Sequence, residues 1–246
     1  MASRFAGDLA AGMSLPRLSQ YRSDDKSDLD MLTNFLWNVQ LCKALYPSLL
    51  GLEIALRNSI HRAATLRYGT SRWFDLSGVL LPLQREMIRH AKADIAARRK
   101  LADTQALTAD DMVPALTLGF WSSVLNSPYE LPNPAMPQLL TWHDARSNPT
   151  ELFAQVFPHA PRAFRSRNRV CDAITPLVWL RNRVVHQEPI YQCPDLPTYH
   201  RDMVRLTGFV NPELRSMMML CDDFPTTYFG GRIGIEMKIR NYLNLL

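Results

Sequence analysis

Apolar residues recur at helical spacing along most of the chain, beginning with a long segment near the N-terminus. In residues 28–45, leucine, phenylalanine and valine return every three or four positions, which is typical of the buried face of a helix. Pro47 disfavours helical geometry at Tyr46, so we expect this first helix to end there. The same proline suits the first turn of a second helix over about 47–67, which Gly69 would end.

Similar periodicity, together with helix start signals, predicts further helices. Pro16 suits the first turn of a short helix, and Thr108 with Asp111 forms a partial capping box. Pro176 can kink or split the helix in which it lies. We expect the later helices over about 81–101, 108–126, 135–142, 149–156, 162–187, 195–207, 211–221 and 233–245.

The fold class that follows is all-α, a helical bundle with irregular additions. No segment shows the sustained alternation of apolar and polar residues, bounded by hairpin turns, that marks a strand. Residues 1–13 are small and polar enough for a loose N-terminal tail. The remaining residues, 14–246, are of a length that one domain can bury around a core, so we expect a single domain.

The composition and the length of the apolar runs indicate where in the cell the protein is found. Apolar residues make up 47% and charged residues 21% of the chain, as in ordinary soluble proteins. No apolar run reaches the length of a membrane span, and the first residues lack the apolar core of a signal peptide. We therefore expect a cytoplasmic protein with no membrane partner.

The cysteines and histidines do not predict a metal site. The four cysteines are scattered and form no Cys-x-x-Cys pair. His186, Cys193 and His200 are evenly spaced seven apart, but prolines interrupt any single helix through them. We expect free thiols, no metal and no cofactor.

The charge distribution fits a polyanionic partner such as RNA. The formal net charge is +5, which permits such a partner without requiring one. Four arginines, at positions 162, 165, 167 and 169, crowd one short segment. Two interpretations of this cluster stay open. The arginines can form a solvated helix face, or they can form an RNA-binding patch that steers phosphates; the residues are Arg162, Arg165, Arg167 and Arg169.

Several side chains that can bind a phosphate or transfer a proton are close together in residues 180–190, Leu-Arg-Asn-Arg-Val-Val-His-Gln-Glu-Pro-Ile. Asn182 and His186 are four apart, so they share one face of a helix. Arg181 lies about 140° around the helix axis from His186, but its long side chain can curl toward the same site. Arginine can hold a phosphate with two parallel hydrogen bonds, and histidine can move a proton near neutral pH.

The end of this helix is also predictable. Pro189 disfavours helical geometry at Glu188, so the helix should end just after His186. A simpler interpretation treats Arg181 and Glu188 as surface charges and His186 as a helix C-cap. An unrelated sequence with this spacing would favour that simpler interpretation.

A second polar stripe lies on the 47–67 helix. Glu53 and Arg57 are four apart, as are Arg57 and His61, and Asn58 follows Arg57. A surface ion pair of this kind stabilises a helix by only a few tenths of a kcal/mol. Because the flanking residues are apolar, the stripe is expected to be partly buried, where Glu53 needs a cationic partner such as Arg181.

These segments resemble one known family. The Arg-Asn-x-x-x-His string at residues 181–186 resembles the signature of the HEPN superfamily. The longer Arg-Asn-Arg-Val-x-His-x-Glu-Pro-Ile string resembles the Abi-like (AbiD/AbiF-type) phage-defence proteins of that superfamily. The segment from Leu52 to Ile60 and the Phe-Trp pair at 120–121 resemble other parts of the same proteins, so the resemblance covers roughly residues 15–210.

The resemblance implies a HEPN-type helical bundle with additional helices, with the 162–187 helix as its signature helix. It implies a homodimer whose two motifs meet in one composite active site, and metal-independent endoribonuclease activity. The catalytic role carries over to Arg181, Asn182 and His186. A weaker, supporting role carries over to Glu53, Arg57 and Asn58.

The expected function is therefore RNA cleavage by 2′-OH transesterification, as a toxin-like effector in anti-phage abortive infection. An RNA or protein antitoxin is a further partner that the sequence leaves open. Two alternatives remain. The first is a non-catalytic HEPN module that binds a structured RNA, and the second is a regulatory interaction protein that binds a partner toxin.

Overall fold

The computed structural model describes residues 2–22, 27–142 and 151–244, and these residues form an all-α protein. The described segments contain α-helices, short 3-10 turns and one isolated bridge between Asn133 and Met136. The predicted all-α class is confirmed. The HEPN-type arrangement of the bundle stays a prediction.

The chain divides into two compact units, whereas we expected a tail followed by one domain. Unit 1 comprises Met1–Ser48, Trp179–Arg201 and Met219–Leu246, and unit 2 comprises Leu49–Val178 and Asp202–Met218. The division falls inside four helices, α3 (Asp28–Tyr68), α8 (Arg167–Val185), α9 (Leu196–Val210) and α10 (Pro212–Met219). Because no linker separates the units, no shift in composition marks the division in the sequence.

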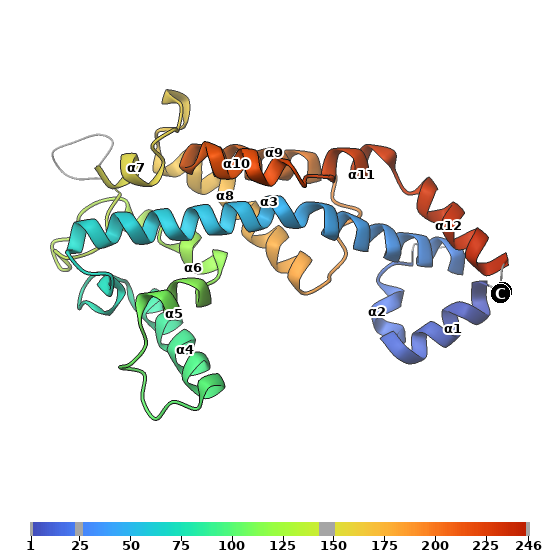
Figure 1. Cartoon of the computed structure of the whole chain (residues 1–246), viewed down its shortest axis with the longest axis horizontal. Coiled ribbons are helices and arrows are strands. Elements are labelled where there is room, and N and C mark those ends of the chain that lie inside the picture. The colour runs from blue at the N-terminus through green and yellow to red at the C-terminus, as the bar shows by residue number, and fades with distance from the viewer. Residues whose placement is uncertain (1, 23–26, 143–150, 245–246) are drawn as a thin grey trace. The chain divides into compact units, whose positions relative to one another are not determined.

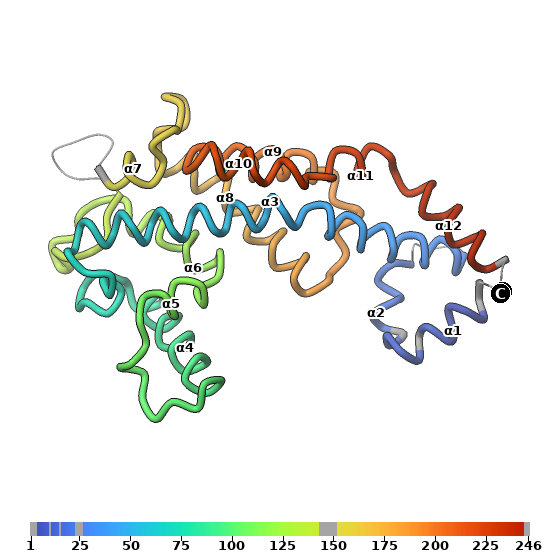
Figure 2. The backbone as a smooth tube through the Cα atoms, viewed as in Figure 1, coloured from blue at the N-terminus to red at the C-terminus, as the bar shows by residue number. Residues whose placement is uncertain are grey.

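Helix α3 is one element where the sequence predicted two. Figure 2 traces α3 without a break, and Pro47 lies inside this helix. An interior proline removes one backbone hydrogen bond and costs about 3 kcal/mol. Buried neighbours on both sides, among them Leu45 and Leu49, supply packing that outweighs this cost. Among the described helices, α3 alone is long and apolar enough to cross a membrane by length and composition, and half of its most apolar window is buried.

Unit 1 is built around a core shared by helices from both ends of the chain. Its helices, besides parts of α3, α8 and α9, are α1 (Ala2–Met13), α2 (Leu15–Ser19), α11 (Phe224–Gly230) and α12 (Ile233–Asn244). Figure 1 shows α12 beside the N-terminal part of α3. The core contains Ala6, Leu18, Tyr21, Met31, Leu32, Ile239 and Leu243. The expected loose tail is therefore wrong, because residues 2–13 are helical and Ala6 is buried in this core.

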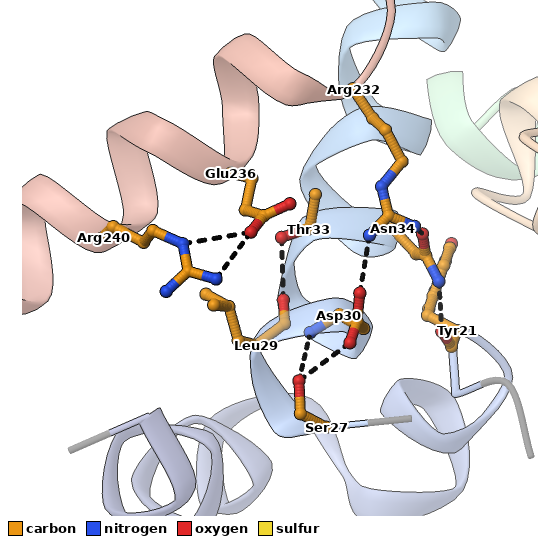
Figure 3. A network of polar contacts seen from close by, with 9 residues as sticks. All are labelled: Tyr21, Ser27, Leu29, Asp30, Thr33, Asn34, Arg232, Glu236 and Arg240. Carbon is orange, nitrogen blue, oxygen red and sulfur yellow. Dashed lines mark hydrogen bonds and ion pairs between the residues drawn. The ribbon is translucent and has the colours of Figure 1, made fainter. Parts of the chain in front are cut away.

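Polar contacts at the start of α3 join the two ends of the chain within unit 1 (Figure 3). Arg232, just before α12, donates to Asn34 at 2.8 Å and pairs with Asp30 at 2.6 Å. Asn34 in turn donates to the carbonyl of Tyr21 at 3.0 Å. The hydrogen bond from Ser27, followed by that from Arg232, lowers the pKa of the Asp30 carboxyl. This network keeps the segment around Tyr21 close to α3.

Unit 2 holds the remaining elements, which Figure 1 shows grouped around the C-terminal half of α3. Thr108 donates to Asp111 through both its backbone N–H and its hydroxyl, each at 2.8 Å, which confirms the predicted N-terminal cap. The elements are η1 (Trp73–Asp75), α4 (Pro82–Arg99), α5 (Ala109–Ala115), α6 (Leu118–Ser123), η2 (Ser127–Tyr129), α7 (Glu151–Val156), η3 (Arg162–Phe164) and α10 (Pro212–Met219), with parts of α3, α8 and α9.

Three predicted helices differ from the structure. The helix expected over 162–187 begins as the 3-10 turn η3 (Arg162–Phe164) and is α-helical only from Arg167. The helix expected over 108–126 is two helices, because the backbone is extended at Leu116 and Thr117. The helix expected over 135–142 is absent from that described segment, where prolines at 132, 134 and 137 remove backbone donors. The start of the helix expected over 149–156 lies outside the described residues.

Three buried tryptophans, Trp73, Trp121 and Trp142, anchor the core of unit 2. Each indole N–H has a partner, as buried indoles require. Trp73 donates to Nδ1 of His61 at 3.1 Å, and Trp121 donates to the carbonyl of Leu116 at 3.1 Å. His61 is therefore tied to the core as an acceptor, which favours its neutral form.

We expect His61 to make stability depend on pH. Burial lowers the pKa of His61, and Asp110 opposes this only in part. The unfolded chain then binds more protons below about pH 6.5, so the free energy of unfolding falls as pH drops through that region. His61→Gln keeps an acceptor for Trp73 but does not titrate. Urea midpoints at about pH 7.5 and 5.5 should differ less in this variant than in the wild type; equal differences would contradict the assignment.

Candidate functional site

The C-terminal end of α8 carries the candidate site, and its backbone geometry is well defined. The helix ends at Val185, as the proline at 189 predicted. The N–H of Glu188 donates to the carbonyl of Arg183 at 2.8 Å, and that of Gln187 to Val184 at 3.2 Å. This pair of hydrogen bonds is a Schellman motif, which satisfies the last carbonyls of the helix. His186 is the C-cap residue. We call residues 186–191 the α8 turn.

The α8 turn contains a strained residue that the N-terminal segment holds in place. Gln187 has φ +56°, the left-handed conformation that usually falls to glycine. A non-glycine residue pays about 1–2 kcal/mol there. Arg17 donates to the side-chain oxygen of Gln187 at 2.8 Å and to the carbonyl of His186 at 3.4 Å. The Tyr21 hydroxyl donates to the carbonyl of Gln187 at 3.2 Å.

A buried amide on α3 fixes the rest of the α8 turn. The side-chain oxygen of Asn38 accepts the N–H groups of Ile190 at 2.6 Å and Tyr191 at 3.2 Å. Its nitrogen donates to the Tyr21 hydroxyl at 3.2 Å and to the carbonyl of Glu188 at 3.4 Å. Only 2% of Asn38 is exposed, so these bonds form away from competing water. Asn38 thus replaces the backbone partners that the turn lacks.

Arg183 supports the turn from the helix itself. Its Nε donates to the carbonyl of Pro189 at 3.2 Å and lies 3.5 Å from the Glu188 carboxylate. Its guanidinium also lies over the ring of Trp179, 4.9 Å from the centroid. The sequence pattern assigned Arg183 no role, and the structure gives it a positioning role.

The three predicted catalytic residues lie on the helix end that this turn completes. Asn182 and His186 are exposed and share one face, joined by the hydrogen bond from the His186 N–H to the Asn182 carbonyl at 2.9 Å. Arg181 is half-buried beside them. The arrangement places an imidazole and a carboxamide in solvent next to a permanent cation, which is suited to binding a phosphate and moving protons.

The predicted supporting residues lie in unit 2. Glu53 and Arg57 are half-buried and Asn58 is exposed. The Nε of Arg57 is buried, with no hydrogen-bond partner in the described part of the chain. The expected pairing of Glu53 with Arg181 stays a prediction, because the two residues belong to different units.

Three of the four arginines in the predicted RNA-binding patch are exposed, and one is buried. Arg162, Arg165 and Arg169 are exposed, as a phosphate-steering role requires. Arg167 is only 4% exposed, donates to the carbonyl of Leu125 and pairs with Glu130 at 2.9 Å. A buried cation must have such partners, so Arg167 is a structural residue and its assignment to RNA binding is corrected.

The histidines and cysteines considered as metal ligands do not gather into a site in the described part of the chain. In the described ranges, no group of three or more histidine, cysteine or acidic side chains is placed to hold a metal ion. His200 pairs with Asp222 at 2.8 Å and stacks on Phe224, with ring centroids 4.6 Å apart. All four cysteines are free thiols.

Sequence reasoning missed Arg17, Tyr21 and Asn38, which hold the α8 turn. One signal was available, since Asn34 and Asn38 are polar residues four apart on a helix segment with many apolar residues. A buried amide needs a partner, so such a pair indicates a second segment packed against the helix. The identity of that segment depends on residues about 150 positions away.

We expect Asn38→Ala to destabilise the protein and loosen the α8 turn. The change leaves the N–H groups of Ile190 and Tyr191 buried without their acceptor, which costs roughly 1–3 kcal/mol. Asn58→Ala, an exposed position on the same helix, is the matched control and should change stability by less than about 0.5 kcal/mol. Urea unfolding measures both. Faster amide hydrogen exchange at Ile190 in the Asn38 variant would localise the effect, and unchanged exchange there would contradict it.

No protein-family model matches this chain, and no curated protein or solved structure matches it. The chemistry of the site's own residues therefore carries the functional proposal.

Proposed function

We propose that this protein is a metal-independent endoribonuclease whose active site lies at the end of α8. One observation carries the proposal. Exposed His186 and Asn182 share a helix face beside the Arg181 cation, on a turn that Arg17, Tyr21, Asn38 and Arg183 hold in place. A histidine that takes part in a reaction must be held in a fixed position, and the contacts to this turn hold His186 in that way.

The proposed reaction uses the RNA itself as the nucleophile. A histidine removes the proton of a ribose 2′-OH, and the oxygen attacks the adjacent phosphorus. The bond from phosphorus to the 5′-oxygen breaks, and that oxygen takes a proton from a second acid. The products are a 2′,3′-cyclic phosphate and a 5′-hydroxyl. Arg181 stabilises the charge on the phosphoryl oxygens, and Asn182 orients the phosphate or the imidazole. DNA lacks the nucleophile and is not cut.

A second copy of the chain completes this site in the proposal. One motif supplies one histidine, whereas the reaction needs a base and an acid. A symmetric homodimer that brings two copies of His186 together supplies both. The exposed arginines Arg162, Arg165 and Arg169 would steer RNA toward the protein.

The biological setting of the proposal rests on the resemblance of the 181–190 segment to Abi-like HEPN proteins. On that basis the enzyme acts in the cytoplasm as a toxin-like effector of anti-phage abortive infection, with an RNA or protein antitoxin as a further partner. The alternatives are a HEPN module that binds structured RNA without cutting it, and a regulatory protein that binds a partner toxin. The exposed imidazole and its fixed turn favour the catalytic function over both.

We expect His186→Ala to reduce RNA cleavage by roughly 10²–10⁴-fold while the protein stays folded, because it removes an exposed acid–base group. Arg181→Lys keeps the charge but loses the planar fork, so it should lose most activity. His90→Ala is the matched control, since His90 is an exposed histidine on α4 whose loss should leave cleavage unchanged. The measurement is gel analysis of a labelled oligonucleotide, scored for both rate and end chemistry.

The end chemistry separates this mechanism from metal-dependent cleavage. Products should carry 2′,3′-cyclic phosphate and 5′-hydroxyl ends, form in excess EDTA, and be absent when the cut site carries a 2′-O-methyl group. Ends with 5′-phosphate, or activity restored to EDTA-treated protein by Mg²⁺, would show that the proposed reaction is wrong. RNA binding without any cleavage would favour the non-catalytic module.

Subunit mixing tests the composite site. When wild-type and His186→Ala subunits are mixed at equal amounts and allowed to exchange, a site that needs both histidines retains about a quarter of the activity, because only wild-type pairs cut. Independent sites would retain about half. Light scattering should show a dimer under the same conditions. A monomer that cuts RNA at full rate would overturn the composite site and leave the RNase activity standing.

A further inference from the structure

Trp179 differs from the other tryptophans of the chain. Trp37, Trp73, Trp121 and Trp142 are buried, but 42% of Trp179 is exposed. All five lie in the described ranges, so Trp179 is the one tryptophan with a large solvent-accessible surface.

The helical register places Trp179 on the same side of α8 as the candidate site. Asn182 follows it by three residues, Arg183 by four and His186 by seven, which are the spacings of one helix face. All of these residues belong to unit 1. Trp179 lies about 10 Å from His186 along the helix axis.

The Trp179 ring is held in a fixed orientation. The Arg183 guanidinium lies over the ring at 4.9 Å, and Tyr199 meets it edge-on, with centroids 6.4 Å apart and planes at 68°. Arg183 is itself anchored by the carbonyl of Pro189 and the carboxylate of Glu188. An exposed side chain that is already ordered loses little conformational entropy when a ligand binds to it.

From these observations we propose that Trp179 and Arg183 form a stacking platform for a nucleobase next to the phosphate that is cut. The proposal deepens the proposed function, because it names an RNA-binding subsite of the same face. Flat, accessible aromatic and guanidinium surfaces bind nucleobases by stacking. Asn182 and His186 lie on the same helix face as the platform, so a base close to a phosphate bound there reaches it.

Stacking of this kind does not depend on the identity of the base. Every base has a π-face, so stacking on the platform accepts any base. The platform therefore contributes affinity and position, and it does not select a sequence. Its contribution is also largely insensitive to salt, unlike that of phosphate contacts.

Tryptophan fluorescence tests the platform directly, since Trp179 is the exposed emitter. A short RNA with 2′-O-methyl groups throughout is not cut and serves as the probe. Titration of this RNA into wild-type protein should quench emission and shield it from acrylamide. Trp179→Leu should abolish this quenching and weaken binding roughly five- to hundredfold. The slope of log Kd against log salt should stay unchanged. Trp179→Phe should recover part of the affinity.

Val185→Ala is the matched control, because Val185 is an exposed apolar residue of α8 outside this face. It should leave affinity unchanged. Affinity for the RNA probe that is the same in wild type and Trp179→Leu would overturn the platform. Loss of the dimer in Trp179→Leu, with no RNA-dependent quenching in the wild type, would overturn it in favour of a protein interface.

The outcomes also separate the platform from the cleavage reaction. Quenching that depends on Trp179, in a protein that cuts no RNA, would support the platform and overturn the RNase proposal. Cleavage that depends on His186 but is indifferent to Trp179, in both rate and affinity, would overturn the platform alone. If Trp179→Leu fails to fold, the affinity of Trp179→Phe and the acrylamide quenching of the wild type distinguish the same outcomes.

Discussion

The buried amide of Asn38 is the interaction on which the candidate site depends. The helix ends before His186, and the N–H groups of Ile190 and Tyr191 lie beyond the last hydrogen bonds to helical carbonyls. Asn38 accepts two of those N–H groups and donates to the carbonyl of Glu188. One side chain from the first third of the sequence therefore determines where the residues after His186 lie.

The site separates residues that hold the turn from residues that face solvent. Arg17, Tyr21 and Arg183 bond to backbone or side-chain atoms of the turn and keep Gln187 in its left-handed conformation. Asn182 and His186 stay exposed on the resulting helix end. Arg183 does both, because its Nε donates to the Pro189 carbonyl while its guanidinium lies over the exposed ring of Trp179.

Proline and arginine show where sequence reasoning succeeds and where it fails. Pro189 correctly predicted the end of α8, because it restricts the backbone of the residue just before it. Pro47 suggested a break that does not occur, since buried residues on both sides stabilise a continuous α3. Among the four crowded arginines, Arg167 is buried against Leu125 and Glu130. A sequence gives the charge of each arginine but not the partner that decides its role.

The sequence by itself determined the all-α class, the cap at Thr108, the end of α8 and the shared face of Asn182 and His186. These features depend on residues within one or two turns of each other, where helix geometry and proline stereochemistry leave few alternatives. The tertiary structure decided that the first residues form a packed helix, that the chain forms two units, and that Asn38 holds the α8 turn. These features depend on contacts between residues far apart in sequence, and their free energies exceed the local preferences that a sequence pattern reports.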